Sequence, residues 1–462
     1  MRDTVVTPAG PGAQERVPTG ACFGYGLGSL GTGMFSAVPG LLLLYFLTDT
    51  LGVAAGVAGV AVFVPKLWDM VTDPLMGTIS DRTSSRWGRR RPYLLVGSLT
   101  LPVFFALMFA VPDLGPRASF GYVTAMFVLA ATAFTVFVVP YVAMPAEMTG
   151  DYHERTRVMS YRIAFMSVGI LVAGAAAPAI VEVAGGGRSG YALMGVILGL
   201  VCGAAMLATF FSTRSCSFTA RSEIQPPLRE QLSVALRNRP FLVLVGAMLI
   251  QLLGVATILA AVPFYAEYIL EGSGFTVTIM FVCLILPAVA AMPGWLWVSR
   301  RIGKAKAYML SVVLFGLGGP VLLLGSPERL ILVYAVVAVM GLAYGGTQLF
   351  PYSMLPDTIE VDAANSGMRR EGVFTGVLTA SEKVGMAAGA LIAGAVLGRF
   401  GFVESVAGQT VVQPESALTG ILVAFCILPA VFFALSLPVL ARYDLTEERL
   451  RSLAAEDRGV NP

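Results

Sequence analysis

The chain has little charge and almost no histidine, and each shortage excludes a broad class of protein. Only 13% of its 462 residues are Asp, Glu, Lys or Arg, whereas an ordinary soluble domain carries about 25%. A soluble protein needs a charged surface to face water, and this chain has too few charged residues to cover itself. His153 is the only histidine, so no histidine-based metal site or catalytic triad can be assembled.

Cysteines and catalytic motifs are scarce as well. The five cysteines are odd in number and have no metal-like spacing, which argues against a disulfide framework. The patterns Gly-x-Ser-x-Gly and His-Glu-x-x-His do not occur. The net charge of +3 gives no indication of a nucleic-acid partner. We therefore expect neither an enzyme nor a nucleic-acid-binding protein, and we expect no cofactor.

Apolar residues, in contrast, make up 56% of the chain. A helix needs about 20 residues to cross the hydrocarbon core of a membrane, and it satisfies its own backbone hydrogen bonds in lipid. The alternating pattern of outer-membrane strands is absent. The sequence predicts an all-α membrane protein with twelve transmembrane helices, at residues 21–48, 54–79, 93–112, 118–148, 158–183, 190–212, 240–270, 275–299, 306–325, 329–356, 371–399 and 416–441.

Basic residues predict the orientation of these helices. The loops that follow the even-numbered helices 2 to 10 hold most of the arginines and lysines, and positive charge is retained on the cytoplasmic side. Both termini, including the tails 1–20 and 442–462, should therefore be cytoplasmic. We expect a multi-pass protein of the cytoplasmic (inner or plasma) membrane. The opposite loops carry only Arg117, Arg188, Arg329 and Arg399.

The two halves of the chain resemble each other. A polar loop, 213–239, separates six helices in residues 21–212 from six in residues 240–441. Predicted helices 4 and 10 both end in Pro-Tyr-x-x-x-Pro followed by an acid, at 140–147 and 351–357. A second sequence similarity occurs between the ends of predicted helices 2 and 8. Two matches at corresponding helices indicate a duplicated six-helix unit with pseudo-symmetric halves, the parallel repeat of the major facilitator architecture.

Predicted helix 2 carries ionisable residues at membrane depth. Asp69 and Asp73 are four residues apart and share one helix face, with Thr72 nearby and Lys66 on roughly the same face. Each such group costs about 2.5–3.5 kcal/mol in the membrane, so it needs a polar surrounding, a partner or a bound ion. One interpretation is a site for Na⁺ or H⁺ formed by Asp69, Asp73 and Thr72. The other is a neutralised Lys–Asp pair that only holds helices together.

This motif resembles that of the glycoside–pentoside–hexuronide:cation symporters. It reads Trp-Asp-x-x-x-Asp-Pro-x-x-Gly-x-x-x-Asp from Trp68 to Asp81 and is followed by a basic loop ending in Arg-Pro-Tyr. The resemblance implies that Asp69 and Asp73 bind the coupling cation, that Arg162 contributes to the substrate site and that Lys383 lies near the cation site. We expect Lys383 and further intramembrane polar residues to line the substrate cavity: Tyr25, Tyr141 and Gln348.

The resemblance also implies a function, with one departure. Sugar-binding members have acids where this chain has Gly33 and Val138, so the substrate is either a sugar held differently or a less polar molecule. We expect a monomeric symporter that moves a sugar or glycoside-like solute with Na⁺ or H⁺ by alternating access, in contact with membrane lipid. The alternative is a carrier of an amphiphilic or apolar substrate, such as a lysolipid, that could work outward.

Charged residues at the cytoplasmic helix ends have two compatible interpretations. They provide the positive charge that fixes the orientation, and they also suit a gate that latches the cytoplasmic ends together. Under the second interpretation the gate residues are Asp81, Arg82, Arg89, Glu147, Arg157 and Asp357.

Overall fold

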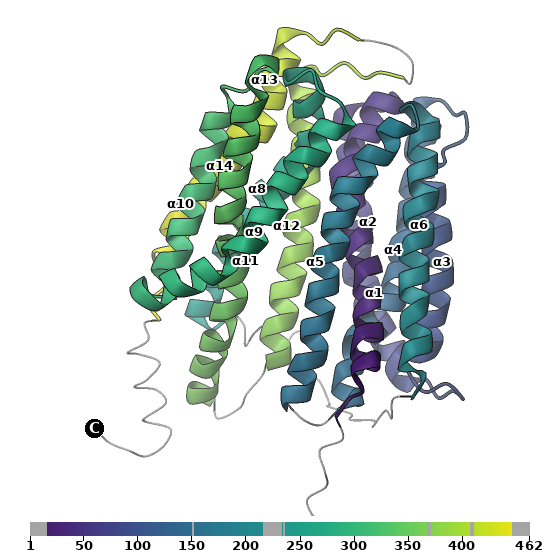
Figure 1. The fold of residues 1–462 in the computed structure, drawn as a ribbon, viewed down its shortest axis with the longest axis vertical. Helices are drawn as coiled ribbons and strands as arrows, with labels where there is room; N and C mark the ends of the chain where they lie inside the picture. The colour runs from purple at the N-terminus through teal and green to yellow at the C-terminus, as the bar shows by residue number, and fades with distance from the viewer. Residues whose placement is uncertain are drawn as a thin grey trace, which may run out of the picture.

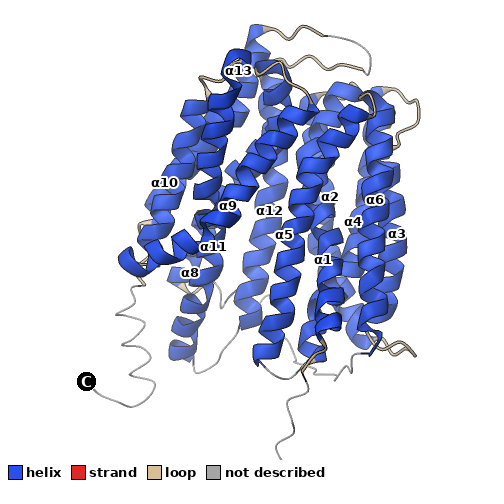
Figure 2. Cartoon of the chain, viewed as in Figure 1, coloured by secondary structure: helices blue, strands red, loops and turns tan. Residues whose placement is uncertain are grey.

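The computed structural model describes residues 16–149, 152–215, 233, 236–366, 371–406 and 411–445. Regular structure in these residues is helical, apart from one isolated β-bridge between Leu51 and Val406. Twelve of the helices are long and apolar enough to cross a membrane, which confirms the prediction of twelve spans (Figures 1 and 2). Most of the predicted tails and of the loop 213–239 lies outside the described residues.

The first half contains six spans, the first of which is extended by two π-helical turns. The turns Pro39–Leu43 and Phe46–Thr50 follow α1. Short loops separate successive spans. The helices are α1 (Thr19–Val38), α2 (Ala55–Arg82), α3 (Arg91–Phe109), α4 (Pro116–Met148), α5 (Tyr152–Val183) and α6 (Gly187–Ser212).

The second half repeats this plan. A π-helical turn, Tyr265–Ile269, extends its first helix, and another, Val423–Ile427, lies inside its last span between α13 and α14. The helices are α8 (Arg239–Phe264), α9 (Gly274–Ile302), α10 (Lys304–Leu322), α11 (Leu330–Ser366), α12 (Glu371–Arg399), α13 (Glu415–Leu422) and α14 (Leu428–Leu440).

The largest difference from the predicted bounds is at α11. The sequence predicts an end at Pro356, but the helix continues to Ser366. A proline removes one backbone hydrogen bond, and the rest of the helix ladder carries the chain past it. The residues beyond Pro356 are more polar, so apolar length alone marks where the membrane segment ends and not where the helix ends.

The two halves meet along two pairs of helices. α2 packs against α12, and α5 packs against α9. α9 occupies in the second half the place that α2 occupies in the first, and α12 likewise corresponds to α5. Each boundary helix therefore contacts the counterpart of the other, as expected for two similar units related by a two-fold axis. Figure 1 shows the first half, in purple to teal, beside the second, in green to yellow.

Glycine allows the closest helix pair in the first half, α1 with α5. A Cβ atom on Gly33 would lie 2.5 Å from the backbone oxygen of Met166, and one on Gly169 would lie 2.3 Å from that of Leu30. Both distances are far below van der Waals contact. The two backbones can approach this closely only because neither position carries a side chain, as is common between membrane helices.

We predict that Gly169→Leu destabilises the protein by about 1–3 kcal/mol, because the new side chain has to push α1 and α5 apart. The measurement is thermal unfolding of the purified protein in detergent. Gly121→Leu on α4 is the matched control, since no atom lies within 4 Å of a Cβ at that position. Equal melting temperatures for the two variants would contradict the close approach.

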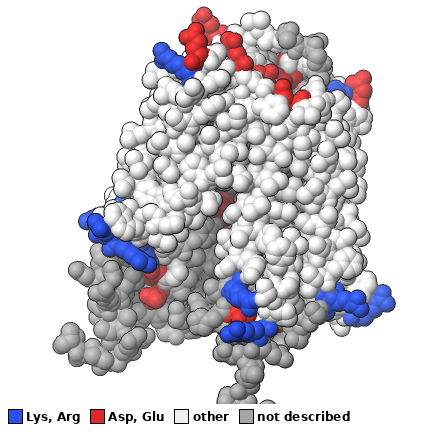
Figure 3. Space-filling view, viewed as in Figure 1, with Lys and Arg blue, Asp and Glu red and all other residues white. Residues whose placement is uncertain are grey.

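The halves are joined mainly at one end of the bundle. We call the end at which residues 16 and 445 lie the terminal end, and the opposite end the far end. At the far end the backbone N–H of Ser405 donates to Thr48 at 3.1 Å, and that of Gly274 donates to Glu182 at 2.9 Å. Figure 3 shows a hollow between the halves that starts near mid-height and widens toward the terminal end. The cleft between the halves is thus open toward the terminal end.

Candidate functional site

Both acids of α2 lie beside the cleft, in different surroundings. Asp69 is 1% exposed, and its Oδ1 has no hydrogen-bond partner among the described residues. Asp73 is partly exposed and accepts a hydrogen bond from the Thr135 hydroxyl at 2.8 Å. It also forms an ion pair with Lys383 of α12. A buried carboxylate oxygen without a partner is costly, so Asp69 is a strong candidate for binding a cation.

The ammonium group that pairs with Asp73 comes from the other half of the protein. Lys383 reaches Asp73 across the boundary between α2 and α12. Lys66 instead lies over two aromatic rings, 5.8 Å from the centroid of Phe35 and 5.9 Å from that of Phe127. Within the part of the chain that the structure describes, no ion pair links Lys66 to either acid. The interpretation of a local Lys66–Asp pair therefore does not fit this structure.

Two hydroxyl groups complete an oxygen-rich site. The Thr72 hydroxyl donates to the backbone oxygen of Trp68 at 3.1 Å and lies 3.5 Å from the Thr135 hydroxyl. Thr135 comes from α4 and was missed by the sequence analysis. It is one of few polar residues in the apolar stretch of that helix, which is the signal that could have identified it. Carboxylate and hydroxyl oxygens suit a small hard cation or a proton.

A second set of polar side chains comes from both halves of the protein. Arg162 of α5 is electrostatically coupled to Tyr352 of α11 and Glu382 of α12. Its Nε is buried and has no hydrogen-bond partner among the described residues. The Tyr352 hydroxyl donates to Glu382 at 2.8 Å. The set therefore combines a guanidinium group of the first half with a hydrogen-bonded tyrosine–carboxylate pair of the second half.

The second half also contributes amide groups near this set. Gln348 donates to the Tyr344 hydroxyl, and with Gln251, Tyr352 and Glu382 it lines a small cavity of about 20 Å³. Gln348 thus lies where the sequence analysis expects a cavity-lining residue. Glu382 was noted only as the neighbour of Lys383, because its partners come from α5 and α11 and leave no local pattern.

Tyr25 and Tyr141 are not accessible from the cleft in this conformation. Both side chains are fully buried, and their rings stack at 4.4 Å between α1 and α4. Each hydroxyl donates to the backbone oxygen of the other tyrosine, at 3.1 and 2.6 Å. Their polar groups are therefore satisfied within the first half. These two residues do not line the cleft in this conformation, and their contact with substrate stays a prediction.

The structure explains why no acid stands at position 33. Because a Cβ there would meet the backbone of α5 at 2.5 Å, an Asp or Glu could be placed only if α1 and α5 separated. Val138, the other departure, packs against the apolar core of the bundle. An acid in this region therefore has to come from another helix, as Glu382 of α12 does, which lines a small cavity of the second half.

The expected gate residues form separate clusters within each half. Glu147 accepts hydrogen bonds from Arg89 at 2.5 Å and from Arg90 at 2.9 Å. Arg90, which the sequence analysis did not single out, also pairs with Asp81 at 2.5 Å. These contacts hold the terminal ends of α2, α3 and α4 together. They do not cross the cleft.

Three other gate expectations need correction. Asp357 pairs with Lys304 of its own half at 2.8 Å and not with the arginines of the α2–α3 loop. Arg157 pairs with Glu154, three residues earlier on α5, at 3.0 Å. Arg82 is exposed, and no hydrogen bond links its side chain to a described residue. At the terminal end, each of the ion pairs seen among the described residues thus stays within one half.

Comparisons with known proteins agree with this arrangement. The family described as MFS/sugar transport protein matches residues 24–447. The uncharacterized symporter YnaJ of Bacillus subtilis is 31% identical over 443 residues, which cover 94% of this chain and 93% of that protein. The isoprimeverose transporter of Lactiplantibacillus pentosus is 25% identical over 455 residues, with coverages of 97% and 93%.

A solved structure shares the fold. A bacterial homologue of the human lysosomal transporter Spinster superposes with a TM-score of 0.65, at 12% sequence identity, and the match covers 93% of this chain and 98% of that one. The twelve helices therefore adopt the architecture of major facilitator transporters.

Proposed function

Because this chain belongs to the MFS/sugar transport protein family, and within it to the glycoside–pentoside–hexuronide:cation symporters, we propose that it carries a sugar or glycoside together with Na⁺ or H⁺. Its relatives are transporters and not enzymes. The chain works by alternating access, in which the cleft opens first at one end of the bundle and then at the other. No step requires a cofactor.

The observation that carries this proposal is the pairing at the cation site. Asp73 of the first half pairs with Lys383 of the second, while Asp69 beside it is buried and unpartnered. An incoming cation would bind both carboxylates and displace the ammonium group. Since the Asp73–Lys383 pair links the two halves, its release changes how they are held together. Cation binding is thereby coupled to movement.

The substrate binds in the cleft between the halves. Arg162 offers a guanidinium group from α5, whose Nε has no hydrogen-bond partner among the described residues, and Glu382 and Gln348 offer an acceptor and an amide from the second half. Sugar hydroxyls both donate and accept hydrogen bonds, so they suit such a mixed set. The amphiphile alternative is less well supported, because this set is polar and a relative is named as a transporter of isoprimeverose.

We also propose that the terminal end is cytoplasmic and that the protein works as a monomer in the cytoplasmic membrane. On the face drawn in Figure 3, lysines and arginines gather toward the terminal end and acids toward the far end. This is the distribution that the retention of positive charge in the cytoplasm produces. In this orientation the structure is open to the cytoplasm.

The test of the proposed function is uptake into proteoliposomes under imposed gradients. Labelled glycosides should accumulate when Na⁺ or H⁺ is higher outside, and not when both gradients are absent. A thermal-shift screen of sugars and lysolipids on the purified protein selects the substrate class. Stabilisation by lysolipids with no response to any sugar would support the amphiphile alternative instead.

We predict that Arg162→Gln raises the apparent Kd for the sugar by about tenfold, the equivalent of one charged hydrogen bond at about 1.4 kcal/mol. The affinity for the coupling cation should stay the same, because no hydrogen bond or ion pair joins Arg162 to Asp69 or Asp73 among the described residues. Both values can be measured by calorimetric titration. Arg188→Gln, which removes an exposed ion pair with Asp113 at the far end, is the control. Equal sugar affinity in both variants would contradict the assignment.

A further inference from the structure

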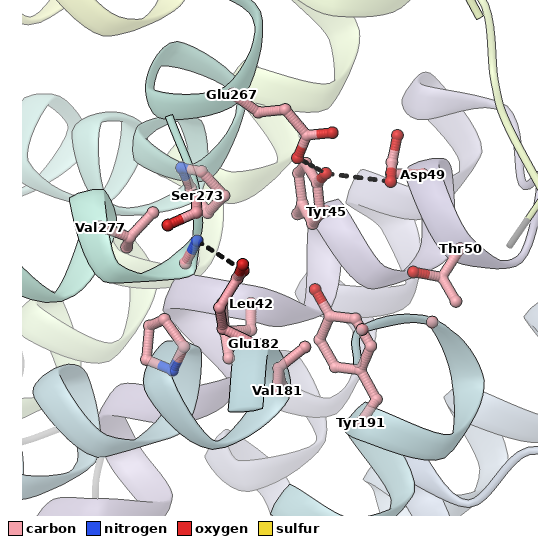
Figure 4. A pocket seen from close by; sticks show the side chains of 15 residues that line it. Leu42, Tyr45, Asp49, Thr50, Val181, Glu182, Tyr191, Glu267, Ser273 and Val277 are labelled. Atoms are coloured by element: carbon pink, nitrogen blue, oxygen red, sulfur yellow. Dashed lines mark hydrogen bonds between the residues drawn. The ribbon is translucent and has the colours of Figure 1, made fainter. Parts of the chain in front are cut away.

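A cavity of about 220 Å³ lies between the two halves at the far end of the bundle (Figure 4). Three acids line it, and they come from three separate elements: Asp49 after α1, Glu182 near the end of α5 and Glu267 after α8. Tyr45 and Tyr191 also face it. The described residues that line the cavity include no lysine or arginine. The carboxylates therefore have no cationic side chain there to neutralise them.

One tyrosine hydroxyl lies between acids from opposite halves. The Oη of Tyr45 is 3.0 Å from Oδ2 of Asp49, in its own half, and is also hydrogen-bonded to Oε2 of Glu267, in the other half. Figure 4 shows both interactions. A phenol has a single proton, so it can donate to one of these carboxylates at a time. The carboxyl group that does not receive the Tyr45 proton therefore needs a different hydrogen-bonding role.

The surrounding donors indicate which acid receives the Tyr45 proton. Oδ1 of Asp49 accepts a hydrogen bond from the Tyr268 hydroxyl at 2.5 Å and lies 3.0 Å from the Ser405 hydroxyl, whose proton is shared with the backbone oxygen of Asp49. Several donors around one carboxylate favour its charged form. Tyr45 therefore donates to Asp49. The contact between Tyr45 and Glu267 is then favourable when Glu267 carries a proton and donates it to the Tyr45 oxygen.

The other acids of the cavity also favour a proton on Glu267. Glu182 accepts a hydrogen bond from the backbone N–H of Gly274 at 2.9 Å. It adds a further negative charge to the cavity. Charged Asp49, Glu182 and Glu267 would repel one another across a cavity without cations, and like charges disfavour ionisation of the last group. Glu267 is exposed, so its carboxyl group can exchange a proton with water.

We propose that Glu267, Tyr45 and Asp49 form a proton-binding site that closes the far end of the transporter. The bound proton completes a chain of donors from Glu267 to Tyr45 to Asp49, and this chain ties the second half to the first. When the proton leaves, the Glu267 carboxylate faces the Asp49 carboxylate with one shared proton on Tyr45, and repulsion favours opening. The site is separate from the cation site at Asp69 and Asp73, and its ligand is H⁺.

The experiment measures the distance between spin labels on the two halves at the far end. Labels are placed at Ala118 and Arg329, both exposed, after the native cysteines have been removed. Without Na⁺ or sugar, we expect the ratio of short to long distances to be about fivefold higher at about pH 5 than at about pH 9, a shift of about 1 kcal/mol. Protonation stabilises the closed arrangement, so closure is favoured at low pH and lost at high pH.

Variants separate this site from other acids. Glu267→Gln keeps a donor toward Tyr45 at every pH, so the short distance should predominate at both pH values. Tyr45→Phe removes the central link and should abolish the increase at low pH. Glu415→Gln, an exposed acid at the start of α13, should respond like the parent protein.

Two results would overturn the proposal. One is a parent distance distribution that does not change with pH, and the other is a Glu267→Gln variant that follows pH as the parent does. Because the measurement uses neither a cation gradient nor substrate, it does not depend on the proposed symport. Loss of cation coupling at Asp69 would leave this result unchanged, so failures of the two proposals can be told apart.

Discussion

Replacing Asp69 with Asn is expected to abolish cation-driven uptake while leaving the protein folded. Asparagine has nearly the size of aspartate, so packing around this buried position is preserved, but the negative charge is lost. The apparent affinity for the coupling cation should fall by about 100-fold, which corresponds to about 2.7 kcal/mol. The initial rate of uptake into proteoliposomes, measured against Na⁺ concentration and against pH, gives this affinity and identifies the cation.

The control for Asp69→Asn is Asp113→Asn. Asp113 is a fully exposed acid at the far end that pairs with Arg188 at 2.8 Å. It carries the same charge as Asp69 but lies far from the cleft, so its loss should leave the dependence on cation unchanged. If Asp69→Asn transported with the cation dependence of the parent protein, Asp69 would not be a cation ligand. The buried, unpartnered oxygen would then need another explanation.

Replacing Lys383 with Met is expected to separate exchange from net transport. The empty carrier has to return through a state in which Asp73 has no cation, and Lys383 is the group that neutralises it there. Without that ammonium group, an unpaired carboxylate remains in the membrane region, which costs several kcal/mol. Net uptake should fall by at least about tenfold, the equivalent of about 1.4 kcal/mol. Exchange of labelled for unlabelled sugar, with cation on both sides, should persist.

The Lys383→Met variant should also bind the coupling cation more tightly, because the competing ammonium group is gone. Lys66→Met is the matched control on α2, since Lys66 lies over the rings of Phe35 and Phe127 and forms no ion pair with a described residue. It should retain net uptake. Loss of net uptake in Lys66→Met with full activity in Lys383→Met would reverse the roles assigned to the two lysines.

These two predictions describe one mechanism. In the proposed mechanism, Asp69 gives the site its affinity for the cation, and the exchange of partner at Asp73 links that affinity to the arrangement of the halves. The Asp73–Lys383 pair lies on the boundary between α2 and α12, so a change there is felt by both halves. The far-end cluster around Tyr45 also joins the two halves, through the turns that follow α1 and α8. Closure at that end can therefore respond to protons independently of the cation bound in the middle of the protein.

The sequence alone determined the features that depend on neighbouring positions. Apolar runs of membrane length predict twelve spans, and a spacing of four residues places Asp69 and Asp73 on one face of α2. The cluster of Arg89, Glu147 and Asp81 was also predictable in part, because charged residues were expected to meet at helix ends. Each of these predictions follows from helix periodicity or from the cost of charge in lipid, both of which act locally.

Only the tertiary structure decided which distant groups meet. Lys383 pairs with Asp73 across 310 positions of sequence, and Tyr45 meets Glu267 across 222. The sequence suggested Lys66 as the partner because it is close along the helix, and it suggested Tyr25 and Tyr141 as cavity residues because they are polar. Which ammonium group reaches an acid, and which hydroxyl is already satisfied, depends on how α1, α2, α4 and α12 pack. That packing is set by contacts between helices far apart in sequence, so no local pattern records it.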